Sequence, residues 1–271
     1  MSLVDARARI EERAHAFSGT WTWAAHDLCT GERAFAGDQG WFPTASAAKL
    51  PIHSALARAV SRGEATWQEP HTLSREGLVG DDGILAQLVL PLTLPLADFA
   101  TLMLIVSENS ATNVVIDRLG VGPINDAFAA FGLADGLVLR RRIQDAAPVG
   151  DDVFARARAA TLLRYVAMLA AGRIPGAAET LRVARAQQHR SQMPRLLPPG
   201  GGEDALAVAH KPGSDAGTRT DFGLVEGMGR RFAFVMMVKD CPDRGFAFDH
   251  PAERLIAEGC RITFDALAPK A

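Results

Sequence analysis

The sequence of 271 residues lacks long apolar runs, paired cysteines and an excess of charge of either sign. No stretch approaches the roughly 20 apolar residues that a membrane-spanning helix needs, so no membrane partner is expected. The three cysteines, Cys29, Cys241 and Cys260, form no metal-spaced pair, which predicts free thiols and no metal site. A formal net charge of −2 gives no electrostatic reason to bind nucleic acid. We therefore expect a small-molecule substrate, no cofactor and a monomeric chain.

Several catalytic signatures are missing as well. The sequence has no Gly-x-Ser-x-Gly nucleophile elbow, no His-Glu-x-x-His zinc motif and no Walker loop, which argues against three common enzyme classes. Its first 18 residues are charged and amphipathic, without the apolar centre of a signal peptide. The sequence as written predicts a cytoplasmic protein, and a periplasmic or secreted one if a leader precedes it in nature.

What is present is the composition of a globular protein with a large core, 48% hydrophobic and 22% charged. Period-two alternation predicts strands at 20–27, 33–36, 206–211, 218–226 and 232–238. Helical spacing predicts helices at 4–17, 45–60, 96–106, 111–119, 123–131, 155–171, 176–189 and 251–266.

Strands from both ends of the chain thus enclose a helical block. This order predicts an α+β fold, in which an α/β/α sandwich with an antiparallel sheet carries an inserted all-α domain. We expect residues 1–44 and 190–271 to form the sheet domain. Residues 45–189 are expected to form the inserted domain.

The first candidate site is Ser46-Ala47-Ala48-Lys49, at the start of a predicted helix. Residues three apart share a helical face, so the ammonium and the hydroxyl are expected to be neighbours. A lysine with a desolvation-lowered pKa can take the proton of a serine nucleophile, and helix N-terminal N–H groups favour developing negative charge. The alternative is a helix-capping serine and a solvated lysine. With ten serines and four lysines, chance predicts only about 0.15 such pairs.

Two further segments carry polar groups suited to a cleft. Ser107-Glu108-Asn109 lies between two predicted helices, where a loop can present a hydroxyl and an amide. Lys211-Pro212-Gly213 lies at the end of a predicted strand. Strand alternation turns neighbouring side chains to opposite faces, so if Lys211 faces a cleft, His210 faces away from it. The alternatives are an ordinary helix cap and an ordinary turn.

In this order, Ser-x-x-Lys, Ser-Asp-Asn and Lys-Thr-Gly are the signature of class A β-lactamases and penicillin-binding proteins, which this chain resembles. The first motif is intact and the other two are near-matches, at separations of 61 and 104 residues that are similar to those of class A enzymes. The flanking segment 41–52 also reads like the family's nucleophile segment. The resemblance spans nearly the whole chain. It implies an α/β domain with an inserted helical domain and the site in the cleft between them.

The resemblance implies catalytic roles for the matching residues. Ser46 is similar to the acylated nucleophile, Lys49 to its activating partner and Ser107 to the proton shuttle to the leaving nitrogen. Asn109 and Lys211 complete the polar wall of the same site.

A substrate-binding edge is implied in the same way. The backbone N–H groups of Ser46 and Ser214 resemble the oxyanion hole, next to Gly213 of the third motif. Arg219 resembles the arginine with which some class A enzymes hold a substrate carboxylate, a role that suits its planar donor fork.

The sequence difference from the family with the largest expected effect on catalysis lies in the loop between residues 136 and 152. Class A enzymes carry there a Glu-x-x-Leu-Asn whose glutamate positions the deacylating water, whereas this segment contains no glutamate. Matching Gly150-Asp151 to the family's Gly-Asp puts Arg141 at the glutamate position and Asp145 at the asparagine position. Asp145 is the nearest carboxylate that could orient water; otherwise it is a loop residue or an ion-pair partner of Arg140–Arg142. General-base assistance is typically worth 10²–10⁴-fold, so its loss predicts slow acyl release.

Two other motif positions differ. Glu108 replaces aspartate, a conservative change that lengthens a side chain expected to support the loop. Pro212 replaces the hydroxyl residue of Lys-Thr-Gly, which removes a donor to the substrate carboxylate and points away from ordinary penicillins. Ser214 and Arg219 are the expected compensation, unless the substrate lacks that carboxylate.

The resemblance therefore predicts a serine hydrolase that forms an acyl-enzyme on Ser46, in first place a β-lactamase of weak activity. One alternative is an esterase or amidase with a different acyl donor. Another is a penicillin-binding or sensor-like protein that becomes acylated without efficient release.

Overall fold

The computed structural model describes residues 2–80, 83–143, 153–199 and 205–268. Its centre is a five-stranded antiparallel sheet in the order β2-β1-β10-β9-β8. The strands are β1 (Thr20–Asp27), β2 (Arg33–Gly37), β8 (Ala207–Asp215), β9 (Thr218–Gly227) and β10 (Arg230–Lys239). The predicted antiparallel sheet from both chain ends is thereby confirmed, with β8 as an edge strand.

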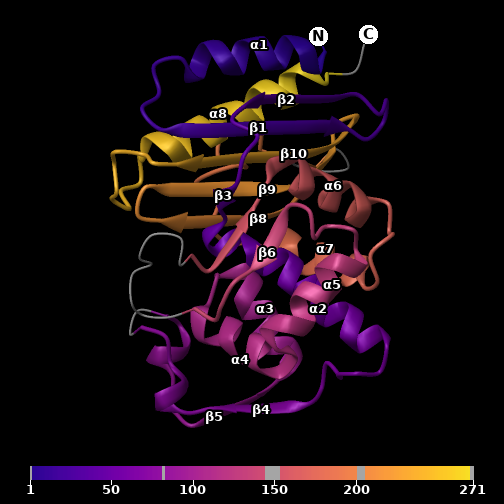
Figure 1. Cartoon of the computed structure of the whole chain (residues 1–271), viewed down its shortest axis with the longest axis vertical. Helices are drawn as coiled ribbons and strands as arrows, with labels where there is room; N and C mark the ends of the chain where they lie inside the picture. The colour runs from indigo at the N-terminus through magenta and orange to yellow at the C-terminus, as the bar shows by residue number, and fades with distance from the viewer. Residues whose placement is uncertain (1, 81–82, 144–152, 200–204, 269–271) are drawn as a thin grey trace.

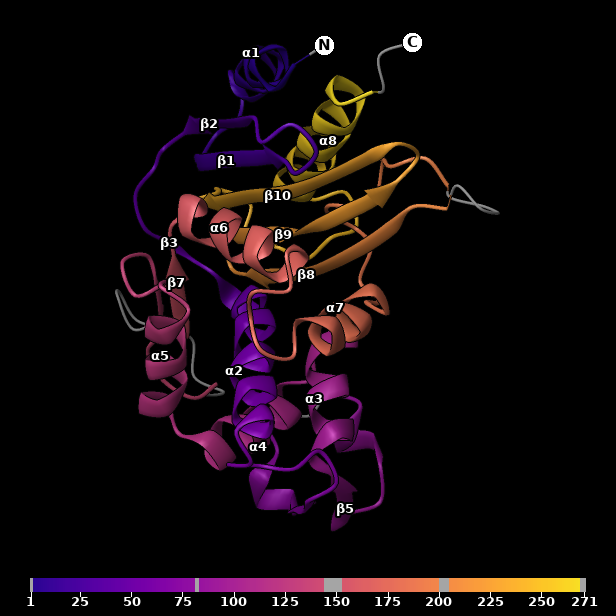
Figure 2. The same cartoon turned by 90° about the vertical axis from the view of Figure 1, so that its right-hand side faces the viewer.

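Helices cover both faces of this sheet (Figure 2). Helices α1 (Leu3–Ala14) and α8 (Pro251–Ala266) lie on one face, and α6 (Ala159–Ala170) packs against β1, β9 and β10 on the other. Neighbouring strand residues divide between the two layers, because successive side chains point to opposite faces. On β10, Phe234 packs in the core under α1 and α8, while Val235 packs in the core shared with the helical body.

The remaining helices form a body on the α6 side of the sheet (Figure 1). They are α2 (Lys49–Ser61), α3 (Leu96–Ile105), α4 (Asn109–Leu119), α5 (Val121–Ala130) and α7 (Ala177–Arg185). Helix α2 contacts α3, α4, α5 and α7, so it is buried along most of its length. Its first residues stand directly below β8 and β9, which places the start of α2 at the junction of sheet and helices.

Some local predictions were wrong. The predicted helix at 155–171 begins only at Ala159, because β7 (Ala155–Ala157) is recruited into a small sheet with β3 (Phe42–Pro43) and β6 (Leu137–Leu139). A hairpin of β4 (Pro70–Leu73) and β5 (Leu92–Pro95) was not predicted, because it depends on pairing across 21 residues. Within the expected inserted domain 45–189, helix α6 lies on the sheet as a layer of the sandwich.

Three short 3-10 helices complete the described structure: Ala45–Ala48, Arg75–Gly77 and Leu85–Gln87. Among the residues that the structure describes, no helix is long and apolar enough to cross a membrane. The same residues contain no cluster of three His, Cys, Asp or Glu side chains that could hold a metal ion. The cysteines are free thiols, of which Cys29 is exposed and Cys241 and Cys260 are buried.

Candidate active site

Ser46 lies in the 3-10 turn that leads into α2, not in the first α-helical turn itself. The turn is anchored by Thr44, whose hydroxyl donates to the carbonyl oxygen of Ala155 at 3.1 Å. Ala45 adopts a left-handed conformation with φ of 44°, which is strained for an alanine. Such backbone strain persists only where the surroundings impose it, and here it immediately precedes Ser46, the candidate nucleophile.

Gly213 of β8 holds this turn in place from the other side. A Cβ atom at Gly213 would lie 2.3 Å from the carbonyl oxygen of Thr44 and 3.0 Å from the backbone nitrogen of Ser46. Only glycine permits this approach of strand and turn. The structure thus shows Gly213 as the contact that seats the nucleophile turn against the sheet, and its predicted substrate-binding role stays a prediction.

Lys49 is fully buried one turn behind Ser46, and its partners come from the loop before α4. Its Nζ donates to the backbone carbonyl oxygen of Ser107 at 2.7 Å, to Asn109 Oδ1 at 2.7 Å and to Ser107 Oγ at 3.2 Å. The hydrogen bonds of the described residues do not join it to the Ser46 hydroxyl. Catalytic hydrogen bonds often form only when substrate is bound, so this geometry is compatible with a role as base.

The Ser107 hydroxyl lies between two lysines. Lys211 Nζ donates to Ser107 Oγ at 3.0 Å from β8, while Lys49 reaches the same oxygen from α2. Ser107 itself has a left-handed backbone with φ of 60°, so a second strained residue stands at the site. On the opposite face of β8, His210 contacts the carboxylate of Asp221 at 3.0 Å, as the alternation of the strand predicted.

Both lysines have altered acidity. Burial, together with the nearby positive charge of Lys211, lowers the pKa of Lys49 well below its usual 10.5, against an opposing effect of Glu108. Burial lowers the pKa of Lys211 to about 7, partly opposed by Asp221. A neutral Lys49 keeps two N–H groups, which satisfy the two carbonyl-type oxygens at 2.7 Å, and its lone pair then faces the Ser107 hydroxyl at 3.2 Å as a hydrogen-bond acceptor. The site therefore favours lysine in the form that a base requires.

Glu108, the lengthened residue of the second motif, supports the loop from behind. Its buried carboxylate accepts the backbone N–H groups of Ser110 and Leu85 at 3.3 Å each. It fills the space above Gly83, where a Cβ would lie 2.6 Å from Glu108 Oε1. The longer side chain thus fits because the opposing residue is a glycine.

These groups surround a cavity of about 280 Å³. Its lining consists of Ser46, Ser107, Asn109, His189, Ser191, Gln192, Lys211, Pro212, Ser214 and Glu253. The candidate nucleophile, the bridging hydroxyl and one lysine thus face one space, with the second lysine buried behind them. This arrangement can activate a serine and deliver a proton to a leaving group.

The profile of the β-lactamase enzyme family matches residues 5–267. The chain belongs to this family. Its fold matches that of the β-lactamase from Sphaerobacter thermophilus DSM 20745, at 25% identity, a TM-score of 0.88 and full coverage of both chains. PBP-A is 25% identical, with a TM-score of 0.80 over 98% of this chain and 97% of that one. No curated protein matches the sequence.

The extended-spectrum β-lactamase TLA-1 shares the fold at 14% identity, with a TM-score of 0.87 over 99% of this chain and all of that one. Membership of the β-lactamase family makes the chain a serine hydrolase of the class A and penicillin-binding type. The fold and the family predicted from the three motifs are thereby confirmed.

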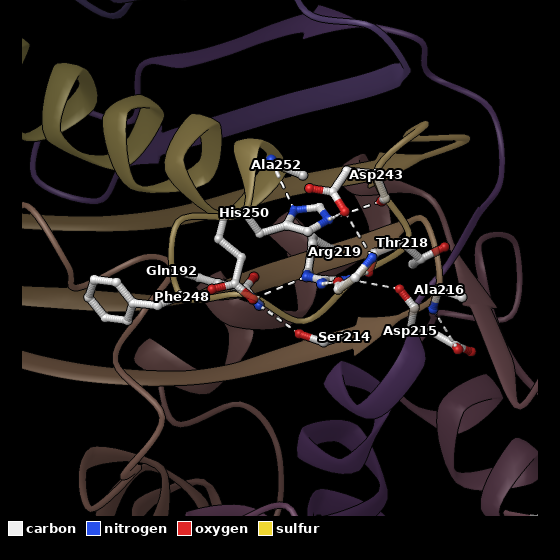
Figure 3. A network of polar contacts seen from close by, with 12 residues as sticks. Gln192, Ser214, Asp215, Ala216, Thr218, Arg219, Asp243, Phe248, His250 and Ala252 are labelled. Atoms are coloured by element: carbon white, nitrogen blue, oxygen red, sulfur yellow. Dashed lines mark hydrogen bonds and ion pairs between the residues drawn. The ribbon is translucent and has the colours of Figure 1, made fainter.

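Within this β-lactamase family fold, Arg219 does not lie where the resemblance suggested. It is fully buried on β9 and does not line the cavity. Its Nε donates to Glu253 at 3.0 Å, and its other nitrogens donate to the carbonyl oxygens of Asp215, Thr218 and Gly245 (Figure 3). The guanidinium that was predicted to hold a substrate carboxylate is occupied by the protein's own carboxylate.

Other members of the cavity wall were missed by sequence reasoning. Ser191 and Gln192 come from the segment after α7, and Glu253 comes from the first turn of α8. None of them belongs to a motif of the β-lactamase family that the sequence displays, so no signal singled them out. Asp145, the predicted carboxylate for deacylation, lies outside the described residues, and its role stays a prediction.

Proposed function

We propose that this β-lactamase family member forms an acyl-enzyme on Ser46 from β-lactam amides and hydrolyses it slowly. The observation that carries the proposal is the contact chain from Lys49 through the Ser107 hydroxyl to Lys211, beside Ser46 in one cavity. In the proposed reaction Ser46 Oγ attacks the acyl carbon while its proton passes to neutral Lys49. The C–N bond then breaks, and the leaving nitrogen receives a proton through Ser107 Oγ. Water finally cleaves the ester and restores the serine.

Slow release follows from the loop between residues 136 and 152. That segment contains no glutamate, and Asp145 is the carboxylate that we propose to orient the deacylating water. A point mutant of PBP-A, a similar structure, is described as an acyl-enzyme complex with penicillin G, so a stable adduct is a realistic state for this architecture. For the present chain we therefore expect acylation to outpace deacylation.

Intact-mass spectrometry after incubation with penicillin G tests the proposal. The wild-type chain should gain the mass of one penicillin and lose it over time, and peptide mapping should place the adduct on Ser46. Ser46→Ala should show no adduct. Ser61→Ala, an exposed serine of α2 outside the cavity, is the matched control and should acylate like wild type.

The time course separates the alternatives. An adduct that never decays would identify a penicillin-binding or sensor-like protein and contradict the hydrolytic half of the proposal. An unmodified mass at high penicillin concentration would contradict the proposal that β-lactams acylate this protein.

A second candidate function is ester or amide hydrolysis with a different acyl donor. Pro212 favours it, because this position offers no hydroxyl to a substrate carboxylate. Turnover of a simple thioester or p-nitrophenyl ester that disappears in Ser46→Ala would support it. Equal rates in wild type and Ser46→Ala would reject it.

A further inference from the structure

One corner of the active-site cavity has an unexpected charge distribution. Glu253, whose side chain lies in the first turn of α8, is the single carboxylate among the ten lining residues that the structure describes. The N-terminal end of a helix favours negative charge, so a charged glutamate is stable at this position. The corner therefore presents an acceptor where the family resemblance predicts donors.

The donors that could recognise an anionic group here are missing or engaged. Pro212 has no polar side-chain atom, and the Ser214 hydroxyl accepts a hydrogen bond from Gln192 Nε2 at 3.1 Å. Arg219 is enclosed behind the wall, paired with Glu253 and covered by Phe246, whose ring centre lies 5.0 Å from the guanidinium carbon. A substrate carboxylate would thus meet a carboxylate without a free arginine to offset it.

Two acceptors of this corner can take a further donor. Glu253 Oε1 accepts from Arg219, and its second oxygen has no partner among the hydrogen bonds of the described residues but is not one of the buried unpartnered atoms. Gln192 is almost fully buried, and its Oε1 has no hydrogen-bond partner either. A buried acceptor without a partner is costly, so a ligand that supplies N–H groups at this corner gains free energy on binding.

Resting on the proposed function, we propose that the corner formed by Gln192, Ser214 and Glu253 binds an N–H-bearing neutral or cationic group of the acyl donor, such as a carboxamide or an ammonium. Strand β8 leads from Lys211, at the Ser107 hydroxyl, to Ser214, so this group belongs to the leaving-group part of the substrate. The preferred substrates are then peptide-like amides or esters whose leaving group carries nitrogen and no carboxylate. Penicillin G, whose leaving part carries a carboxylate, is accordingly an acylating compound but not a preferred one.

Three thioesters that share the same acyl group and differ only in the leaving thiol test this proposal. Phenylacetylglycyl thioesters of thioglycolate, thioglycolamide and 2-(dimethylamino)ethanethiol place a carboxylate, a carboxamide and a tertiary ammonium on the same leaving sulfur. The tertiary amine prevents the S-to-N acyl transfer that would consume a thioester of a primary aminothiol. We expect kcat/KM of wild type for the amide and the ammonium to exceed that for the carboxylate by about tenfold or more, because a substrate carboxylate placed beside the Glu253 carboxylate is disfavoured. A preference of wild type for the carboxylate would overturn the proposal.

Glu253→Gln should reduce the preference for ammonium over carboxylate by about tenfold, since it removes the charge that discriminates the two. Asp265→Asn, at the opposite end of the same helix and outside the cavity, is the matched control and should keep the wild-type ratio. An unchanged ratio in Glu253→Gln would overturn the assignment of Glu253.

A buried arginine without its partner can destabilise Glu253→Gln, so the double variant Arg219→Gln, Glu253→Gln is measured beside it. It removes both charges together and should lose the same preference for ammonium over carboxylate.

Failure of the proposed function would give a different result from failure of the present inference. In that case no thioester is turned over in a Ser46-dependent manner, whereas failure of the present inference leaves Ser46-dependent turnover with the carboxylate preferred.

Discussion

The two sides of the cavity differ in how their charges are arranged. On the acylation side, Lys49 and Lys211 converge on one hydroxyl, and no carboxylate forms an ion pair with either of them within the described residues. On the recognition side, the Glu253 carboxylate reaches the cavity, while its partner Arg219 is enclosed behind the wall. Acyl transfer requires the serines and lysines to lie within hydrogen-bond distance of the reacting atoms, so the geometry of this side tolerates little change.

The recognition side can change its preference between anionic and cationic substrate groups through a single ion pair, without altering the groups that carry out acyl transfer.

The largest effect is expected from Lys49→Met, which keeps the length of the side chain but removes the proposed base. Acylation of Ser46 should slow by about 10²–10⁴-fold, the usual worth of a general base. Rates of adduct formation by mass spectrometry measure it. Lys239→Met, outside the cavity, is the control, because Lys239 donates to the carbonyl oxygen of Trp41. If the acylation rate of Lys49→Met fell by less than tenfold, another group would be the base. The two sides of the cavity would then not differ in the way described above.

The pH dependence of stability should be set by the buried lysines of the acylation side. Because the pKa of Lys211 is lowered to about 7, the folded chain releases a proton that the unfolded chain keeps up to the ordinary lysine pKa of 10.5. The free energy of unfolding should therefore rise between pH 7 and 10, by at most about 1.4 kcal/mol per pH unit for one proton. Urea unfolding of wild type and Lys211→Met at pH 7, 8 and 9 measures it. The variant should show a flatter curve; equal slopes would refute the assignment.

The smallest effect concerns the support behind the acylation side. Gly83→Ala places a Cβ against the Glu108 carboxylate and should lower the free energy of unfolding by about 1–2 kcal/mol, a shift of roughly 2–6 °C in Tm. Glu108→Asp should lose about 1 kcal/mol through its weakened loop hydrogen bonds.

Combining the two changes should cost less than their sum, because the shorter carboxylate makes room for the methyl group. Thermal unfolding of the four chains gives the coupling energy. Strict additivity would show that Glu108 and Gly83 do not depend on each other.

Much of the fold follows from local pattern. Alternation along β1 and helical spacing along α2 and α8 predicted these elements to within a few residues, because the pattern that specifies each lies within its own residues. The exceptions depend on distant partners. The sequence of residues 155–157 does not favour a strand strongly enough to separate them from the helix that follows. Their conformation is decided by pairing with β3 and β6.

In the candidate site, too, some features were predicted from local sequence and others depend on distant contacts. The motifs identified Ser46, Lys49, Ser107, Asn109 and Lys211, and the structure brings all five together. Spacing predicted that Lys49 would meet Ser46, whereas its hydrogen bonds run to Ser107 and Asn109. The reason is that the loop before α4 brings carbonyl-type oxygens to a lysine that has no water to solvate it.

The sequence by itself determined the family, the candidate nucleophile and the absence of a glutamate from the loop at 136–152, because each is written in short segments of the chain that need no tertiary contact to be recognised. Only the tertiary structure decided the charge of the recognition corner. Arg219 and Glu253 are 34 residues apart, and Gln192 comes from a third segment. Packing of α8 against β9 brings the carboxylate to the guanidinium, and a buried arginine requires such a partner.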